Sequence, residues 1–315
     1  MERQVQAFAY TSSDEINSMT FQRYKLINRA PEDIFDTYFA MWVDADLGCF
    51  QDDYVGTDTS RSLAYVYNSD VLDGIGTGCD CDGVETYCDE IPILGVDYFR
   101  GPIMPIFDAD GNQIGEEELG MSSFITIYNG GIGSPDPGTT DPGTAQEYYN
   151  YLQGRWLDGS ALQNSGDGYD EAGGVETRFV FSDPPNEAGG FNMVTADLGV
   201  RDPRTLQASG PFTLQPGSVN ELIVGVVWVP NQTYPNPSIQ RLQQADDLAQ
   251  ALFNNCFDAC DGPDAPDVDV IELDREVILF LSNSISSNNF EEAYVEKGLG
   301  IPEGLDSLYR FEGYR

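Results

Sequence analysis

The sequence predicts a mostly β protein: an Ig-like or jelly-roll β-sandwich with one amphipathic helix, followed by the start of a second β module. Apolar and aromatic residues fall in short runs separated by Gly, Pro and Asp, which is typical of strands and turns. One long stretch repeats apolar residues at helical spacing. A Gly- and Pro-containing break at 262–266 precedes a new alternating pattern. With 41% hydrophobic and 12% aromatic residues, the 315-residue chain can fill a core.

The first part of the chain is expected to form strands separated by two long loops. Alternation and β-branched or aromatic residues predict strands at 19–29, 36–43, 63–67, 91–99 and 122–128. A first loop is predicted at 74–90, which is rich in Gly, Asp and Cys. A second is predicted at 130–144, where two Asp-Pro-Gly triplets mark turns.

The next part adds the helix. We expect a short helix at 147–152 and strands at 177–181, 212–214 and 222–229. The last of these runs is the most hydrophobic, which predicts a central strand buried on both faces. Apolar residues then recur at i, i+3 and i+4 over 238–258, with Ser238 as the expected N-cap.

Two domains are predicted. Residues 1–262 are expected to form the β-sandwich domain, with its Gly/Asp/Cys-rich and Pro-Gly-rich insert loops. Residues 263–315 are expected to start a second, incomplete fibronectin-like β module. Two alternating runs within 268–281, joined by Asp274 and Arg275, predict a hairpin. A strand is also predicted at 309–314, with nothing after it to pair with.

The charge balance restricts the partners. Fifteen Lys and Arg face 53 Asp and Glu, for a formal net charge of −38. Such a surface repels nucleic-acid phosphates and anionic lipid, so we expect neither nucleic-acid binding nor membrane insertion. It attracts cations, above all hard divalent ions that take oxygen ligands. An acidic surface that only maintains solubility is the alternative.

Histidine is absent from the sequence, and this removes several kinds of chemistry. Ser-His-Asp and Cys-His catalysis are excluded, as are most catalytic zinc sites. Carboxylate chemistry would remain, but no pair stands out among 53 acidic residues, so no catalytic residue is assigned and we expect no enzyme. Trp156 is the one tryptophan that we would test for ligand stacking, because Trp228 lies in a hydrophobic strand.

Six cysteines in an acidic, Lys-poor chain indicate an oxidising compartment, and hence an extracellular or cell-surface location. Disulfides are the preferred interpretation, and free structural thiols are the alternative. One bond is expected between Cys256 and Cys260, and two more among Cys49, Cys79, Cys81 and Cys88.

The first candidate metal site is an acidic stretch of 15 residues. Several carboxylates held close together raise one another's pKa, and a divalent cation relieves that repulsion. Ca²⁺ takes six to eight oxygen ligands. The alternative is a solvated acidic turn. The candidate ligands are Asp44, Asp46, Asp52, Asp53 and Asp58.

The second candidate is a loop with oxygen side chains at relative positions 1, 3 and 5, like the opening of a calcium loop. Its glycine is at position 4 instead of 6, and position 12 carries no carboxylate. A non-helical calcium loop and a plain Asp-Gly turn are both possible interpretations. The candidate ligands are Asp108, Asp110, Asn112 and Glu116.

Several segments together resemble large secreted or surface proteins of Bacteroidetes, the kind that end in a type IX secretion sorting domain. They are WVDADLG (42–48), DDYVGTD (52–58), YVYNSD (65–70), VDYFRGP (96–102), GPFTLQPG (210–217), a helix at 245–253 and FEGY (311–314). The resemblance implies secretion, β-sandwich modules and surface display. It carries over no activity and no catalytic residue. The Cys-rich loop at 79–88 departs from the family pattern.

These observations lead to one functional prediction. The chain is expected to be a non-catalytic structural or adhesive module, stabilised by calcium, of a secreted or cell-surface multidomain protein. Its expected partners are other modules of the same polypeptide and an extracellular glycan or surface polymer. The alternative is an accessory carbohydrate- or substrate-binding module of a secreted hydrolase.

Overall fold

A computed structural model describes residues 1–12, 14–74, 79, 81, 86–169, 172–255, 266–285, 287, 289–293, 295–297 and 308–310. The chain divides into two compact units, Met1–Asp246 and Asp247–Arg315. The division falls inside the long helix, and the predicted boundary after residue 262 stays a prediction.

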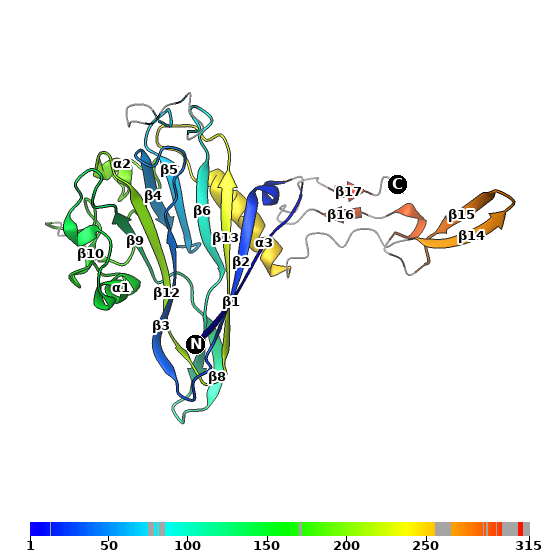
Figure 1. Ribbon diagram of the computed structural model, residues 1–315, viewed down its shortest axis with the longest axis horizontal. Helices are drawn as coiled ribbons and strands as arrows, with labels where there is room; N and C mark the ends of the chain where they lie inside the picture. The colour runs from blue at the N-terminus through cyan, green and yellow to red at the C-terminus, as the bar shows by residue number, and fades with distance from the viewer. Residues whose placement is uncertain are drawn as a thin grey trace. The chain divides into compact units, whose positions relative to one another are not determined.

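Two antiparallel sheets form the sandwich of the first unit, which confirms the predicted β class (Figure 1). The larger sheet has the order β1 (Glu2–Ala9), β2 (Met19–Ile27), β13 (Val219–Val229), β6 (Ile93–Arg100), β5 (Leu63–Asn68), β4 (Asp53–Asp58). The smaller sheet has the order β3 (Ile34–Val43), β12 (Pro203–Leu214), β9 (Ser123–Tyr128).

One hydrophobic core joins the two sheets. Val66 and Val96 from the larger sheet and Phe124, Ile125 and Leu206 from the smaller one belong to the same buried cluster. Burying an aliphatic or Phe side chain contributes about 1.5–3 kcal/mol, so this shared layer is the main source of stability of the sandwich.

Strand β13 is central, as predicted. It pairs with β2 on one side and β6 on the other. Leu222, Ile223 and Val224 are consecutive and all buried, which places side chains of both sheet faces out of solvent.

A long excursion connects β9 and β12, and Figure 1 shows its elements α1, α2 and β10 grouped beside these two strands. Its buried side chains include Tyr151, Trp156 and Met193, which join the core cluster. The predicted short helix is present and starts with a capping box of Thr144 and Glu147. The elements are η2 (Pro137–Thr139), α1 (Ala145–Leu152), β10 (Leu162–Gln163), β11 (Glu176–Thr177) and α2 (Met193–Ala196).

Several predicted boundaries were wrong. The strand expected at 177–181 is reduced to the two-residue β11, and Phe181 has a positive φ of 50°, which turns the chain. Strand β12 starts at Pro203 instead of 212, and β1, β4 and the hairpin of β7 (Ile103–Phe107) with β8 (Gln113–Glu118) were not predicted. Strand β4 is polar and contains Gly56, where a Cβ would lie 2.6 Å from the Tyr65 ring.

The predicted amphipathic helix is α3 (Gln240–Asn254), two residues shorter at its start than expected. The Ser238 hydroxyl accepts a hydrogen bond from the Gln240 N–H at 3.3 Å, in keeping with its expected role as a cap. Early in the helix, Leu242 lies against Gly95 of β6. Among the helices that the structure describes, none is long and apolar enough to cross a membrane.

The second unit contains the predicted hairpin. Strands β14 (Asp267–Leu273) and β15 (Glu276–Ser282) pair antiparallel around Asp274 and Arg275, and Arg275 has a φ of 68°. The expected strand at 309–314 is seen in part as β17 (Leu308–Arg310), which pairs with the preceding β16 (Val295–Lys297). A short 3₁₀ turn, η3, spans Phe290–Glu292.

Candidate metal centre

The acidic stretch at 44–58 does not form a single cluster. The structure places its aspartates in three separate surroundings. Asp44 and Asp46 lie near Arg204. Asp52 and Asp53 lie in a buried corner, and Asp58 lies near Arg61. The sequence places these residues close together along the chain, and the antiparallel strands then separate them in space.

The buried corner, here called the aspartate corner, consists of Asp52, Asp53, Asn68 and Asp73. Their exposed fractions are 3%, 1%, 0% and 0%. Asp53 begins β4 and lies directly opposite Asn68, the last residue of β5, so their Cβ atoms are near neighbours. Asp73 lies in the loop after β5, where its N–H donates to the Cys88 carbonyl at 2.8 Å. Two strand ends and one loop thus build the corner.

Backbone N–H groups hold the three carboxylates in place. Each carboxylate accepts from the main chain of a neighbouring loop, which fixes its orientation. The donors are the Leu47 N–H to Asp53 Oδ2 at 2.8 Å, the Gly74 N–H to Asp52 Oδ2 at 3.0 Å, the Cys49 N–H to Asp73 Oδ1 at 2.8 Å, and the Tyr87 N–H to Asp73 Oδ2.

Three oxygens of the corner have no donor among the residues that the structure describes. Asp52 Oδ1, Asp53 Oδ1 and Asn68 Oδ1 are buried and accept no hydrogen bond from them. Leaving a buried acceptor unsatisfied costs about 1–3 kcal/mol, and more when it is charged. Among the residues that the structure describes, no Lys or Arg forms a salt bridge with these aspartates. The corner therefore has an excess of buried negative charge.

The pKa values express this excess. Burial raises the pKa of Asp52 to about 6; the Gly74 N–H opposes the rise, and the charges of Asp73 and Asp70 add to it. Burial also raises the pKa of Asp53 well above its usual range, with further contributions from neighbouring carboxylates. Both groups would lose a proton more readily with a cation beside them.

The donor atoms of the corner suit a hard cation. A carboxylate oxygen of Asp52 and one of Asp73 lie within 4.8 Å of each other and of Cys49 Sγ. Cys49 forms a disulfide with Cys79, so its sulfur is not a thiolate and the effective ligands are oxygens. Ca²⁺ prefers carboxylate and amide oxygens. Asp52 and Asp73 supply carboxylate oxygens at this spacing, and Asp53 and Asn68 lie next to Asp52 at the facing ends of β4 and β5.

Gly48 makes room for one of these ligands. It has a φ of +80°, and a Cβ at this position would lie 1.9 Å from Asp73 Oδ2. Only glycine combines the left-handed backbone with so close an approach of the carboxylate. The glycine of the WVDADLG segment is thus part of the construction of the corner.

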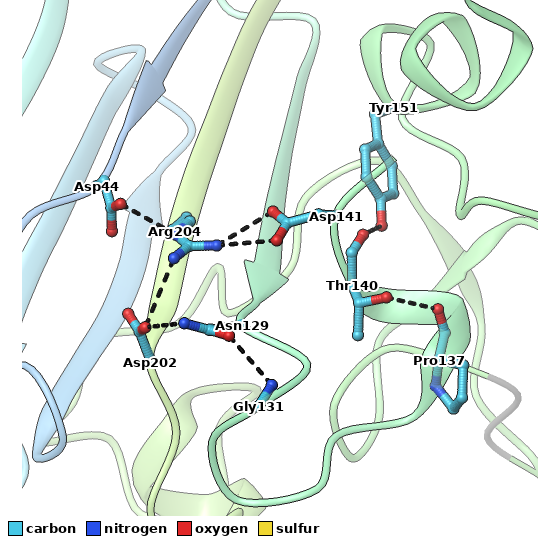
Figure 2. A network of polar contacts seen from close by, with 9 residues as sticks. All are labelled: Asp44, Asn129, Gly131, Pro137, Thr140, Asp141, Tyr151, Asp202 and Arg204. Carbon is cyan, nitrogen blue, oxygen red and sulfur yellow. Dashed lines mark hydrogen bonds and ion pairs between the residues drawn. The ribbon is translucent and has the colours of Figure 1, made fainter. Parts of the chain in front are cut away.

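A second acidic group, the arginine cluster, consists of Arg204, Asp44, Asp141 and Asp202. Figure 2 shows the guanidinium among the three carboxylates. The shortest nitrogen–oxygen distances are 3.1 Å to Asp44, 3.0 Å to Asp141 and 3.6 Å to Asp202. Asn129 also donates to Asp202 at 2.9 Å. Here a cation of the protein itself compensates the carboxylates.

Asp46 lies at the edge of the arginine cluster, with carboxylate oxygens of Asp44 and Asp202 within 4.8 Å. Partial burial raises its pKa, and the charges of Asp44 and Asp202 add to the rise. This trio resembles a metal site in spacing, but Arg204 already binds two of its members.

Asp58 belongs to a third environment. Burial acts to raise its pKa, but hydrogen bonds from Ser60 and Gln243 and the charge of Arg61 outweigh burial and lower it. Nearby, Asp97 and Asp246 are 1% and 3% exposed and hydrogen-bonded to each other, which requires a shared proton. Burial raises the pKa of Asp97, and the charge of Asp246 raises it further. Asp58 is thus satisfied by protein groups.

The second predicted loop is the exposed turn between β7 and β8. Asp108 Oδ1 accepts from the N–H groups of Asp110 and Asn112, and Asp108 Oδ2 accepts from the Asn112 side chain at 3.1 Å. Glu116 is exposed and accepts from Gln113 at 3.5 Å. These internal hydrogen bonds are typical of an Asp-Gly turn, the alternative interpretation of the sequence.

The cysteines pair only in part as expected. Cys49 and Cys79 form a disulfide, while Cys81 and Cys88 are thiols. The thiol of Cys88 neighbours that of Cys81 and, together with burial, raises the pKa of Cys81 to about 11. The expected bond between Cys256 and Cys260 lies outside the described residues.

The stacking role expected for Trp156 does not fit its position. Its side chain is 0% exposed and its Nε1 donates to the Gly168 carbonyl at 2.7 Å, so no face of the ring is open to a ligand. A polar hollow elsewhere is lined by Asn164, Ser165, Phe191 and Thr195 among others. Phe191, the one aromatic residue among those that line the hollow, packs against Phe181.

Comparison with known proteins does not extend this picture. No protein-family model matches the chain, and no curated protein matches it. The resemblance to Bacteroidetes surface proteins stays a prediction.

Proposed function

We propose that the protein is a non-catalytic structural module of a secreted or cell-surface multidomain protein, and that calcium bound in the aspartate corner stabilises it. The observation that carries this proposal is the set of buried oxygens without donors on Asp52, Asp53 and Asn68, in a place without a compensating Lys or Arg among the described residues. A cation would satisfy these oxygens and balance the carboxylates together.

Calcium fits this corner better than zinc or a redox metal. The donor set is made of oxygens, the sequence has no histidine, and the nearby sulfur is held in a disulfide. Ca²⁺ also tolerates irregular coordination, which suits ligands that come from a strand start, a strand end and a loop. Water or main-chain carbonyls would complete its shell.

Burial favours a structural role over a catalytic one. The four side chains are 0–3% exposed, so an ion held there would have no open position for a substrate. It would instead tie the Asp73 loop to the start of β4. The net charge of −38 supports an environment rich in cations, such as the extracellular space.

Display on a cell surface and adhesion to other modules or to a glycan belong to the same proposal. The Cys49–Cys79 disulfide supports an oxidising compartment, since such bonds are rare in the cytosol.

Calcium-dependent unfolding tests the proposal. Thermal and urea unfolding of the full chain are measured in excess chelator, in Ca²⁺ and in Mg²⁺. At a calcium concentration 100 times the dissociation constant, we expect an increase of about 2.7 kcal/mol in unfolding free energy. Equal stability in calcium and chelator would remove the proposal.

A matched pair of variants identifies the site. In chelator, Asp53→Asn should be at least as stable as the natural protein, because it removes a buried charge. In calcium, it should be less stable, because a ligand is lost. Asp110→Asn, in the exposed turn, should follow the natural protein in both conditions. A response to calcium that survives in Asp53→Asn and is lost in Asp110→Asn would place the ion elsewhere.

A further inference from the structure

Two thiols lie directly beside the aspartate corner. Cys88 Sγ is 2.9 Å from the Cys81 carbonyl oxygen, and the two thiols are hydrogen-bonded to each other. Cys81 Sγ also donates to the carbonyl of Asp73 at 3.4 Å. Both cysteines are partly exposed, so a small oxidant can reach them.

The same two cysteines support the loop that carries Asp73. The Asp73 N–H donates to the Cys88 carbonyl, and these two residues form a β-bridge. The Tyr87 N–H, one residue before Cys88, donates to the Asp73 carboxylate. On its other side, the carboxylate accepts from the N–H of Cys49, whose sulfur is bonded to Cys79. Asp73 therefore lies between one formed disulfide and one pair of adjacent thiols.

We propose that Cys81 and Cys88 form a second disulfide, and that this bond holds Asp73 in position for calcium. The proposal rests on the proposed function for its second half, whereas the bond itself can form whether or not calcium binds. With both disulfides closed, Cys49, which donates to the Asp73 carboxylate, and Cys88, which accepts from the Asp73 N–H, are both cross-linked to the segment that follows Asp73.

The reaction needs a disulfide oxidant, such as glutathione disulfide in the secretory pathway. One thiolate attacks a sulfur of the oxidant and expels one glutathione thiolate, which gives a mixed disulfide. The second thiolate attacks the protein sulfur of that mixed disulfide and expels the second glutathione. Two protein thiols are oxidised, one small disulfide is reduced to two thiols, and the two protons are released to solvent and the leaving thiolates.

Thermodynamic linkage makes the effect reciprocal. If the disulfide increases calcium affinity by some factor, calcium must shift the thiol–disulfide equilibrium by the same factor. Coupling of this kind typically amounts to 5–150-fold. We expect about tenfold, because one of the proposed ligands gains rigidity while the others are fixed by β4 and β5.

Peptide mapping tests the bond directly. Cleavage after Arg and Glu separates Cys49 in 33–61, Cys79 and Cys81 in 62–85, and Cys88 in 86–90. After equilibration of the full chain with glutathione disulfide, and without reduction, these three peptides should stay joined. In Cys81→Ser the peptide 86–90 should be released while the other two remain joined. Release of 86–90 from the oxidised natural protein would overturn the proposal.

Calcium titration by calorimetry tests the second half. The variant Cys81→Ser/Cys88→Ser keeps the Cys49–Cys79 bond and should bind Ca²⁺ about tenfold more weakly than the oxidised natural protein. Cys256→Ser/Cys260→Ser is the matched control and should bind with unchanged affinity. Equal affinities in all three proteins would overturn the role assigned to the bond.

An independent measurement uses the natural sequence: the fraction of protein with the Cys81–Cys88 disulfide at a fixed ratio of reduced to oxidised glutathione. The equilibrium constant obtained from this fraction should rise with calcium by the factor found in the titration. An equilibrium constant that does not depend on calcium would contradict the coupling. If the natural protein binds no calcium, the proposed function fails. The peptide map still decides whether the bond forms.

Discussion

The aspartate corner and the arginine cluster each gather three carboxylates where strand ends meet loops, but they balance the charge differently. Asp44 and Asp141 are about half exposed, and Arg204 reaches both of them as well as Asp202. The corner is 0–3% exposed, and no described Lys or Arg bridges its carboxylates. In one region the protein carries its own cation, and in the other we propose that the solvent supplies it.

The difference follows from size and burial. A guanidinium needs space and water around its long side chain, which the surface near Asp44 provides. The corner is 0–3% exposed and borders Gly48 and the Cys49–Cys79 bond, and there we propose that a metal ion balances the carboxylates.

The largest effect is expected from Arg204→Ala. This substitution would leave the Asp202 carboxylate buried without its arginine, and we expect a loss of about 3 kcal/mol in unfolding free energy. The loss is near the lower end for a broken buried ion pair because the other two partners, Asp44 and Asp141, are half exposed. Urea unfolding in chelator measures it, with the exposed Arg155→Ala as control. Equal losses in the two variants would show that the cluster contributes no more than an ordinary surface arginine.

The next effect is a pH dependence of the metal-free protein. Because the folded state raises the pKa of Asp52 to about 6, it binds more protons than the unfolded chain between pH 4 and 6. The contribution of Asp52 is thus present below pH 4 and is lost as the pH rises to 6, by on the order of 2 kcal/mol. The unfolding free energy of Asp52→Asn, measured with urea, should decline less from pH 4 to 8 than that of the natural protein. Identical profiles would argue against a perturbed carboxyl here.

Gly48→Ala sharpens the comparison by moving one carboxylate. It should cost about 1–3 kcal/mol through backbone strain and should also weaken the calcium response, because the new methyl group displaces Asp73. Gly111→Ala is a matched control, since Gly111 has a φ of +83° but nothing within 4 Å of its Cβ. If both variants keep the full calcium response, Asp73 is not a ligand.

The smallest effect is expected from Asp108→Asn in the exposed β7–β8 turn. It weakens hydrogen bonds within the turn, and we expect a loss of about 0.5 kcal/mol with an unchanged calcium response. A calcium response reduced by this variant would restore the turn as a metal site.

The sequence predicted local features well and contacts poorly. The alternation that predicted β2, β5, β6 and β9 depends on near neighbours, and so do the hydrophobic run that predicted β13 and the helical spacing that predicted α3. Strand β4 was missed because its polar residues and Gly56 are explained only by the Tyr65 ring that crosses it. The acidic stretch singled out Asp52 and Asp53 as candidate ligands, which stays a prediction, but it could not single out Asp73 and Asn68, since no spacing rule connects them to it. Their nearness comes from the pairing of β4 with β5.

By itself, the sequence determined the β class of the fold, the excess of acidic residues and the lack of histidine chemistry, because composition and short-range periodicity carry this information. Tertiary structure alone decided which carboxylates meet an arginine and which are buried without a salt bridge to a described Lys or Arg. That choice depends on strand register and on loop closure by Cys49–Cys79, which bring together residues far apart along the chain.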